Sequence, residues 1–390
     1  MNDSQATVTR VRSRCPIFRE KVYLNSCSQG ALSNRVELAF VDYLQSWHQY
    51  GSPWDIWVEH YENARKVFAS FINADPDEVA IVASASAGVN SVASALCFKE
   101  RPKVVLGEFE FPTMGHIWLA QQARGANIEF VNATEDSIPL SAYKAKIDRQ
   151  TLIVPLTHVC FMNGFRSPVA DVVRMAHDHG ALVLLDDYQD CGTRPVDVKA
   201  MDLDFYVSGT LKYLLGPPGM AFLYARRSIV PSLTPTVTGW FGQANPFAFD
   251  VRHFDPAPAA RRFESGTPPI PSIYGSCEGV LLLQEVGLQV VESHVKNLVR
   301  TLLDGARDLK IRTKTPPGSR GPLVVLQAKA AEALVSRFAE NGVIVSSRRD
   351  GLRISFHIYN TLDDVEYVLQ LLQRNLDLLV TEEGNPAVKG

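Results

Sequence analysis

Short apolar runs alternate with stretches of helical periodicity between about residues 60 and 225. The runs are largely apolar on both faces, and they cover residues 78–82, 103–106, 152–156, 181–185 and 205–207. Strands in a parallel sheet have this composition when helices cover both faces of the sheet. The pattern therefore predicts an α/β region built on a mainly parallel sheet.

The helix expected before the run at 181–185 has clear end signals. Ser167 is placed to cap it, Pro168 stands at its first position, and Gly180 lies just past its end. Proline is favoured at the start of a helix and glycine just after its end. These signals support the alternation of strands and helices.

The pattern changes after residue 230. Residues 230–272 are dense in proline and aromatic residues and have no regular period, which is typical of a long loop that contacts a ligand or a partner subunit. A long helical pattern follows at about 279–309, and then a smaller α+β segment. Thr361 and Asp364 predict a capping box at the start of the last helix. Only the last eight or so residues are expected to be disordered.

Composition narrows the class of protein. Hydrophobic residues make up 46% of the 390 residues and charged residues 21%, as in ordinary globular proteins. The net charge of −3 argues against a nucleic-acid or acidic-membrane partner. We expect no membrane span and no secretory signal. The six scattered cysteines suggest reduced thiols in a cytoplasmic protein, and Cys/His spacing does not support a metal site.

The strongest chemical signal is a carboxylate after one buried run and a lysine after the next. Asp186 ends the run at 181–185, and Lys212 lies in a small-residue turn beyond 205–207. The carboxyl ends of strands open into the crevice where α/β folds bind ligands. A buried carboxylate can keep a pyridine nitrogen protonated, and a lysine can supply an amine for a Schiff base. Taken alone, each residue more often has a structural role, Asp186 as a helix cap and Lys212 as a solvated lysine.

Two stretches carry a resemblance to a known family. Residues 185–192 (LDDYQDCG) and 208–219 (SGTLKYLLGPPG) resemble the cofactor motifs of class V aminotransferase-fold enzymes. That family includes cysteine desulfurases, selenocysteine lyases, kynureninases and isopenicillin N epimerase-like proteins. The resemblance spans about residues 22–372. It implies fold type I: a large domain with a mainly parallel seven-stranded sheet between helices, and a smaller α+β C-terminal domain. The expected boundaries are 20–270 for the large domain and 271–380 plus 1–19 for the small one.

The resemblance also implies a pyridoxal 5'-phosphate site. Lys212 would be the catalytic lysine that carries the cofactor as a Schiff base, and Asp186 would hold the ring nitrogen. The segment 83–90 (ASASAGVN) is similar to the family's phosphate loop, and a helix start offers free backbone N–H groups to a phosphate. The implied cofactor-binding residues are Ser86, Ala87, Phe111, Asp186, Gln189, Ser208, Thr210, Lys212 and Thr267.

Other residues are expected to bind the substrate or to complete the site. Arg353 lies in a segment like the one whose arginine binds the substrate carboxylate, and a guanidinium pairs bidentately with a carboxylate. Thr267 lies in a turn that reaches the phosphate of the neighbouring subunit in the family, which implies a homodimer with shared sites. Trp240 and Phe241 are expected to line the substrate pocket, with burial at a dimer interface as an equal alternative.

Departures from the family bear on the reaction. Residues 342–351 contain no cysteine that could accept sulfur, and Cys277 is expected to lie in a helix. Phe111 stands where desulfurases have histidine, so it can stack but cannot transfer a proton. Leu211 replaces a frequent acid/base residue, and Phe161 replaces the desulfurase asparagine. Thr210 is a possible substitute for Leu211 at the phosphate.

Four functions remain open. The leading hypothesis is a lyase or hydrolase that cleaves a C–S or C–C bond in the side chain of an α-amino acid. Transamination comes second and epimerisation at Cα third, because all three begin with loss of the Cα proton. The fourth is a non-catalytic regulator with the same fold.

Overall fold

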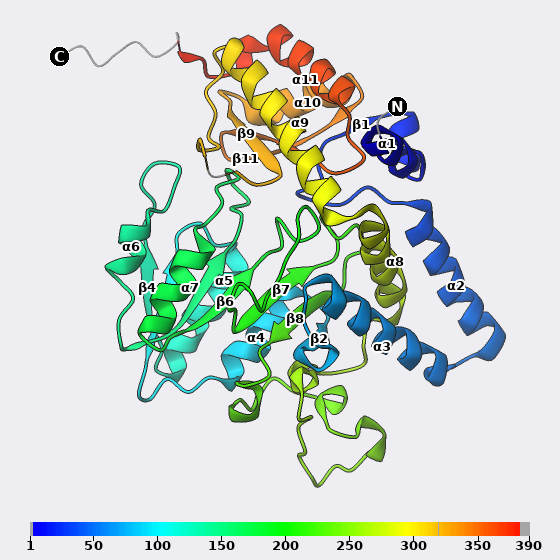
Figure 1. Cartoon of the computed structure of the whole chain (residues 1–390), viewed down its shortest axis with the longest axis vertical. Helices are drawn as coiled ribbons and strands as arrows, with labels where there is room; N and C mark the ends of the chain where they lie inside the picture. Colours follow the sequence, from blue (N-terminus) through cyan, green and yellow to red (C-terminus); the bar gives the residue numbers. More distant parts are fainter. Residues whose placement is uncertain (1–2, 319, 383–390) are drawn as a thin grey trace.

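A seven-stranded sheet forms the centre of the molecule (Figure 1). The computed structural model describes residues 3–318 and 320–382. The strands are β2 (Val79–Val82), β3 (Lys103–Gly107), β4 (Asn127–Val131), β5 (Thr151–Thr157), β6 (Leu182–Asp186), β7 (Phe205–Gly209) and β8 (Ala221–Ala225). Their order is β2-β8-β7-β6-β5-β3-β4, and every neighbouring pair is parallel except β8 with β2 and with β7. The predicted mainly parallel, seven-stranded sheet is confirmed.

Helices cover both faces of this sheet. They are α2 (Asn34–Tyr50), α3 (Trp54–Phe71), α4 (Ala85–Ala95), α5 (Pro112–Ala120), α6 (Leu140–Lys144), α7 (Val169–Asp178) and α8 (Ile270–Val286). Alternate residues of β3 serve the two faces: Val104 and Leu106 pack in the cluster with α4 and α5, and Val105 packs in the cluster with α3, α7 and α8. All three side chains are fully buried, as a strand with no polar face requires.

The expected cap of α7 is wrong. The residue before the helix is Pro168, which has no side-chain donor or acceptor, and Ser167 makes no side-chain cap bond to the helix. The Ser167 carbonyl instead accepts from the Val169 N–H at 2.9 Å. Gly180 does follow the end of the helix, with a φ of 70° that favours glycine.

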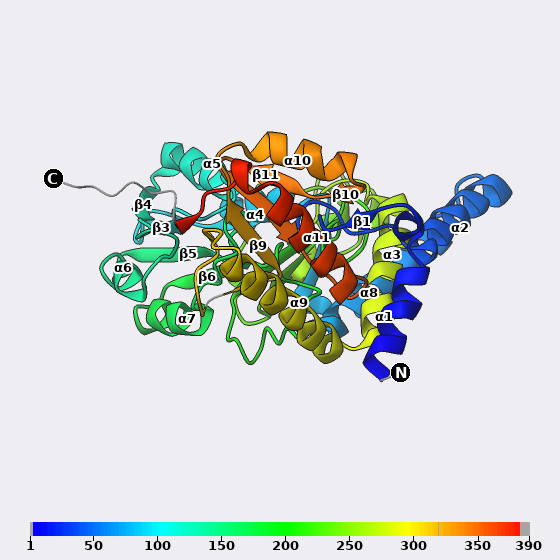
Figure 2. The same ribbon diagram turned by 90° about the horizontal axis from the view of Figure 1, so that it is seen from above.

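The C-terminal part contains a second, smaller sheet. Its elements are α9 (Leu288–Asp308), β9 (Leu323–Gln327), α10 (Ala331–Glu340), β10 (Val343–Ile344), β11 (Ser346–Arg348), β12 (Gly351–Ser355) and α11 (Leu362–Arg374). The antiparallel order is β11-β12-β9, and helices pack on it as Figure 2 shows from above. Thr361 and Asp364 form the predicted capping box.

The single long helix expected at 279–309 is two helices. Gly287 separates α8 from α9, and its φ of 84° interrupts the helical backbone. Helix α8 packs against α2 and α3, whereas α9 packs against α11 and β9. The domain boundary expected near residue 270 stays a prediction. Helix α8 lies beyond that boundary but packs on helices of the sheet domain.

The N-terminal segment lies against the C-terminal part. Helix α1 (Asp3–Ser13) places Arg12 in a bidentate ion pair with Asp364, at 2.7 and 2.9 Å. Strand β1 (Val22–Tyr23) pairs in parallel with β10. These contacts bring residues from both ends of the chain together. The predicted disordered tail lies outside the described residues.

The segment after β8 has no strand of the central sheet, as its sequence suggested. The 3-10 helices of the chain are η1 (Pro16–Arg19), η2 (Pro76–Glu78), η3 (Gln121–Arg124), η4 (Val230–Ser232), η5 (Trp240–Gly242), η6 (Pro246–Ala248), η7 (Ala260–Phe263) and η8 (Leu376–Leu378). Four of them lie between residues 230 and 263, where the chain extends below the sheet in Figure 1. Within the described part of the chain, no helix is both long enough and apolar enough to cross a membrane.

Candidate active site

A cavity of about 330 Å³ opens at the carboxyl ends of β5, β6 and β7. The start of α4, the turn before α5 and the N-terminal loop at residue 28 complete its walls. Five of the residues predicted from the sequence line it: Ser86, Phe111, Asp186, Gln189 and Lys212. Parallel strands end at one edge of a sheet, which explains why residues far apart in the sequence meet here.

Lys212 is half-buried, and its side-chain amine has no polar partner among the described residues. Its Nζ lies 4.3 Å from the centre of the Tyr188 ring and 5.8 Å from that of Phe111. Burial lowers the pKa of the Lys212 amine to about 8, although the nearby Asp186 carboxylate opposes that change. A larger share of this amine than of an exposed lysine is therefore neutral near physiological pH. The neutral amine is the form that acts as nucleophile and base.

Asp186 ends β6 and is 9% exposed. Its Oδ1 accepts one hydrogen bond, from the Tyr188 N–H at 3.0 Å. Burial raises the pKa of this carboxyl to about 6, against the lowering effects of that hydrogen bond and of Lys212. A protonated ring nitrogen placed against Asp186 would offset the cost of burying its charge. The residue therefore fits the expected partner of a pyridine ring.

Gln189 also lines the cavity and has a free acceptor. Its Nε2 donates to the Cys27 carbonyl at 3.2 Å, while its Oε1 is buried without a hydrogen-bond partner. A buried polar atom without a partner is costly in a folded protein. The structure thus leaves Gln189 able to accept a hydrogen bond from a bound ligand.

The start of α4 forms part of the cavity wall. Ser84 caps the helix by accepting from the Ala87 N–H at 3.1 Å, so Ala87 has already used its backbone donor. The Ser86 hydroxyl lies 3.1 Å from the Thr113 hydroxyl, and both residues line the cavity. Hydroxyls and unpaired N–H groups at a helix start suit a phosphate, so the start of α4 fits the phosphate of the cofactor.

Ser208 and Thr210 do not line the cavity. The Thr210 hydroxyl donates to the carbonyls of Pro217 and Met220, at 2.8 and 3.3 Å. The Ser208 hydroxyl is directed to the Gly209 carbonyl at 3.2 Å. Both side chains are buried and bonded to backbone carbonyls in this chain, so the expected contact of either hydroxyl with phosphate has no support here.

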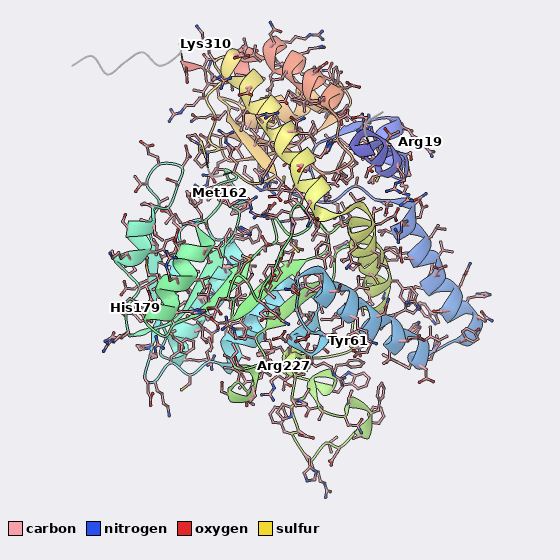
Figure 3. The ribbon with its side chains drawn as sticks, viewed as in Figure 1. Arg19, Tyr61, Met162, His179, Arg227 and Lys310 are labelled. Atoms are coloured by element: carbon pink, nitrogen blue, oxygen red, sulfur yellow. The ribbon has the colours of Figure 1, made fainter. Side chains whose placement is uncertain are left out.

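Thr267, Trp240 and Phe241 also lie away from the cavity within one chain. Thr267 is exposed in its turn, and Phe241 is 2% exposed. Phe241 packs edge-on against Tyr61 of α3, with ring centres 5.4 Å apart; Tyr61 is labelled on that helix in Figure 3. Trp240 packs on Phe241 at 4.5 Å. A role for these residues at a cavity requires a second copy of the chain and stays a prediction.

Arg353 is the buried cation beside the cavity. It is 1% exposed and lies on β12. It donates to the Phe161 carbonyl and the Ser28 hydroxyl, both at 2.9 Å, and these two residues line the cavity. It also donates to Ser346. No carboxylate pairs with Arg353 in residues 3–318 and 320–382, so its charge is free to bind an anionic ligand.

Sequence reasoning gave no role to several residues at this site. Glu110 accepts from the Thr157 N–H at 2.7 Å and from its hydroxyl at 2.6 Å. Burial raises the pKa of Glu110 to about 8, the Thr157 hydrogen bonds lower it, and Asp186 raises it further. Tyr188 and Ser28 line the cavity as well. Tyr188 stands inside the motif at 185–192 and Glu110 directly precedes Phe111, so their positions next to predicted site residues were the available signal.

The residues that follow Asp186 in the chain belong to a cluster of buried polar side chains. His158 Nδ1 lies 2.7 Å from Asp187 Oδ1, and the Tyr206 hydroxyl donates to Asp187 Oδ2 at 2.8 Å. Asp190 pairs bidentately with Arg166, at 2.6 and 3.0 Å. The spacing of the histidine and the two aspartates would admit a metal ion. Their oxygens are already engaged by protein donors, so the cluster is explained as a structural network.

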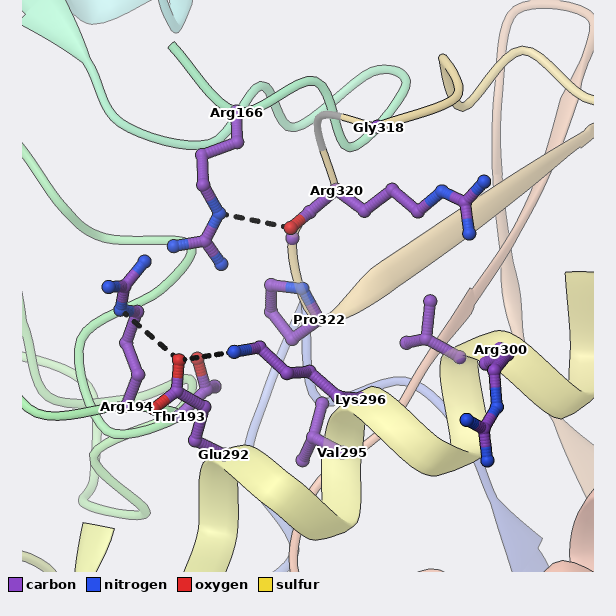
Figure 4. A pocket seen from close by; sticks show the side chains of 12 residues that line it. Arg166, Thr193, Arg194, Glu292, Val295, Lys296, Arg300, Gly318, Arg320 and Pro322 are labelled. Atoms are coloured by element: carbon purple, nitrogen blue, oxygen red, sulfur yellow. Dashed lines mark hydrogen bonds and ion pairs between the residues drawn. The ribbon is translucent and has the colours of Figure 1, made fainter. Parts of the chain in front are cut away.

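A second cavity, of about 520 Å³, lies between α9 and the loops at residues 166, 194 and 320 (Figure 4). It is rich in arginine. Arg194 and Lys296 both approach Glu292, at 3.8 and 2.8 Å, and Arg320 points away from them. The cations therefore do not converge on one point, and we assign the chemistry to the cavity at Lys212.

Comparison with known proteins identifies the family. The model of the family described as Aminotransferase class-V matches residues 46–368. The chain belongs to the class V aminotransferase family. An uncharacterized aminotransferase of Bacillus subtilis, YcbU, is 32% identical over 359 residues, which are 92% of this chain and 95% of that protein. A cysteine desulfurase of Haloferax volcanii is 28% identical over 390 residues, covering 92% of this chain and 90% of that one.

Solved structures confirm the fold of this class V aminotransferase family member. The apo cysteine desulfurase of Thermococcus onnurineus superposes with a TM-score of 0.86 at 23% identity, covering 95% of this chain and 98% of that one. The cystine C–S lyase C-DES, in complex with cysteine persulfide, gives 0.85 at 20% identity and covers 92% and 99%. The chain is a pyridoxal-phosphate-dependent enzyme of fold type I, as the sequence motifs implied.

Proposed function

We propose that this enzyme is a lyase that cleaves a side-chain bond of an α-amino acid, with a C–S bond as the first candidate. The observation that carries the amino-acid substrate is the buried Arg353 guanidinium, which has no carboxylate partner in the described chain and contacts two residues of the Lys212 cavity. The C–S bond is favoured by the cysteine desulfurases among the relatives that match most of the chain.

The residues of the chain have separate tasks in this proposal. When bound, pyridoxal phosphate supplies a ring that accepts electrons from the substrate's Cα. Arg353 binds the α-carboxylate in a fixed orientation, and the Lys212 amine takes the Cα proton and returns it. Asp186 would pair its negative charge with the protonated ring nitrogen. Phe111 lines the cavity and supplies an apolar ring face, which leaves the proton transfer to Lys212.

Sulfur transfer to an enzyme cysteine is not part of the proposal. Residues 342–351 contain no cysteine. Cys27 lies beside this segment, with its Sγ 4.0 Å from the Ser346 hydroxyl, but the residue is only 1% exposed. We therefore propose an elimination: the Cβ–S bond breaks, the sulfur leaves with its electron pair and a proton as a thiol, sulfide or persulfide, and water converts the remaining fragment to pyruvate and ammonia.

Transamination is the second candidate, because the relative at 32% identity is named as an aminotransferase. The two reactions differ in their need for a keto acid. The experiment incubates the holoenzyme with a panel of amino acids, including cysteine and cystine, with and without a keto acid. Release of pyruvate or alanine without a keto acid supports the lyase. Product formation only when a keto acid is added would reject the lyase and support transamination.

We also propose that the enzyme works as a homodimer with shared sites. The segment that contains Thr267 and Trp240 does not reach the cavity of its own chain, so a second copy is needed if it is to contribute. The same region exposes large apolar side chains: Phe249 is 72% exposed, Val251 96% and Phe254 55%. Exposed apolar side chains in such number are typical of a protein interface. A monomeric active holoenzyme in light scattering would refute this proposal.

A further inference from the structure

Tyr188 lines the cavity and its ring lies beside the Lys212 amine. Its N–H donates to Asp186 Oδ1 at 3.0 Å, which fixes the backbone directly after the strand end. The ring then extends over the end of β7 and lines the cavity. Lys212 Nζ lies over the face of this ring, 4.3 Å from its centre.

This ring contact is the nearest partner of the lysine that the structure shows. Within the described residues, the side-chain amine of Lys212 makes no hydrogen bond or ion pair, and the Phe111 ring lies farther away at 5.8 Å. An ammonium group over an aromatic face is stabilised by the ring's negative centre, and more so when water is excluded. The Tyr188 ring therefore both locates the amine and favours its charged form.

The absence of a side chain at Gly209 leaves room for the Tyr188 ring. A Cβ built on Gly209 would collide with ring carbons and with the hydroxyl oxygen of Tyr188. The backbone at Gly209 does not itself require glycine, because Gly209 is not among the residues with positive φ. Space for the Tyr188 ring is thus the reason that glycine stands at the end of β7.

We propose that the face of the Tyr188 ring positions the Lys212 amine. We also propose that residue 209 is glycine because any side chain there would occupy the space of the Tyr188 ring. The inference rests on the role of Lys212 in cofactor attachment. It concerns residues of this chain and does not depend on which bond of the substrate is cleaved.

The first test uses thermal unfolding of the full chain to measure whether the cost of a side chain at residue 209 depends on the Tyr188 ring. Gly209→Ala is expected to lower the melting temperature in the wild-type background, because the new methyl group meets the Tyr188 ring. In a Tyr188→Ala background the same change is expected to cost much less, since the ring is gone. An equal cost of Gly209→Ala in both backgrounds would overturn this reason for glycine at residue 209. This measurement needs neither cofactor nor substrate, so it is independent of the proposed reaction.

The second test measures the amine. The full chain is stripped of cofactor, and the rate of pyridoxal phosphate uptake is followed by absorbance against pH. Tyr188→Leu is expected to move the midpoint down by roughly half to one and a half pH units, because the ammonium loses its aromatic partner. The other groups that act on Lys212 are Asp186, Cys27, Arg353 and Arg348, and all remain in the variant.

Tyr188→Phe is the matched control, since it keeps the ring and removes only the hydroxyl. Its midpoint is expected to equal that of the wild type. A midpoint that does not move in Tyr188→Leu, or that moves as far in Tyr188→Phe, would overturn the role of the ring face.

Discussion

Glu110 gives the sharpest prediction of a pH-dependent effect. Its carboxyl group binds the N–H and the hydroxyl of Thr157 and lies next to the ring of Phe111 in the chain. Since burial raises the pKa of Glu110 to about 8, the group is neutral in the folded protein over much of the working range. Glutamine has the shape of the neutral acid, and it can accept from the Thr157 N–H and donate to the Thr157 hydroxyl.

The direction in which pH changes the stability follows from the raised pKa of Glu110 in the folded state. Below the ordinary pKa of 4.5 the carboxyl is neutral whether the chain is folded or unfolded, so it costs nothing. Between that value and about 8, the unfolded chain loses the proton and the folded chain retains it, so the wild type loses stability as pH rises. The full shift corresponds to about 5 kcal/mol, and solvent contact of the partly exposed side chain reduces this to about 1–3 kcal/mol.

The assay compares the thermal unfolding of wild type and Glu110→Gln from pH 5 to pH 8.5. The variant is expected to match the wild type at the acidic end and to melt about 1–4 °C higher at the alkaline end. The exposed Glu108 provides a control, because Glu108→Gln is expected to show no such trend. A Glu110→Gln variant that is less stable at every pH, or whose advantage does not grow with pH, would refute the reasoning.

Three further predictions concern binding, catalysis and assembly. Arg353→Lys is expected to raise the KM for the amino acid about 10- to 100-fold while leaving the cofactor absorbance unchanged, because a point charge replaces a bidentate fork; an unchanged KM would argue against a carboxylate at Arg353. Asp186→Asn is expected to lower kcat about 10²- to 10³-fold with the cofactor still attached, since the amide cannot hold a positive charge at the ring nitrogen; steady-state kinetics at full kcat would contradict this. Thr267→Val is expected to weaken cofactor affinity in the dimer, and equilibrium binding equal to wild type would exclude Thr267 from the site.

The sequence predicted the centre of the fold well and its periphery less well. Strands β5, β6 and β7 are continuous apolar runs, so composition alone indicates them. Strand β4 was missed because it is half exposed at the sheet edge, and β8 because it follows a glycine- and proline-rich turn directly. The helix break at Gly287 was missed because apolar periodicity continues on both sides of it.

For the site, too, residues in local motifs were predicted, whereas contacts that depend on the folded chain were not. Asp186, Lys212 and Phe111 were identified because their motifs are local, and the fold brings them to one cavity. The hydroxyl of Thr210 is bonded to the carbonyls of Pro217 and Met220 in the following turn, which no local pattern reveals. The fit between Tyr188 and Gly209 depends on two strand ends that only the folded sheet places side by side.

The central claim is that Lys212 carries the cofactor. The direct measurement is borohydride reduction of the purified holoenzyme, followed by mass spectrometry of its peptides. The account predicts that the phosphopyridoxyl group is found on Lys212 and that Lys212→Ala, purified in the same way, carries no label. A label on another lysine of the wild type, or equal labelling of the Lys212→Ala variant, would contradict the account.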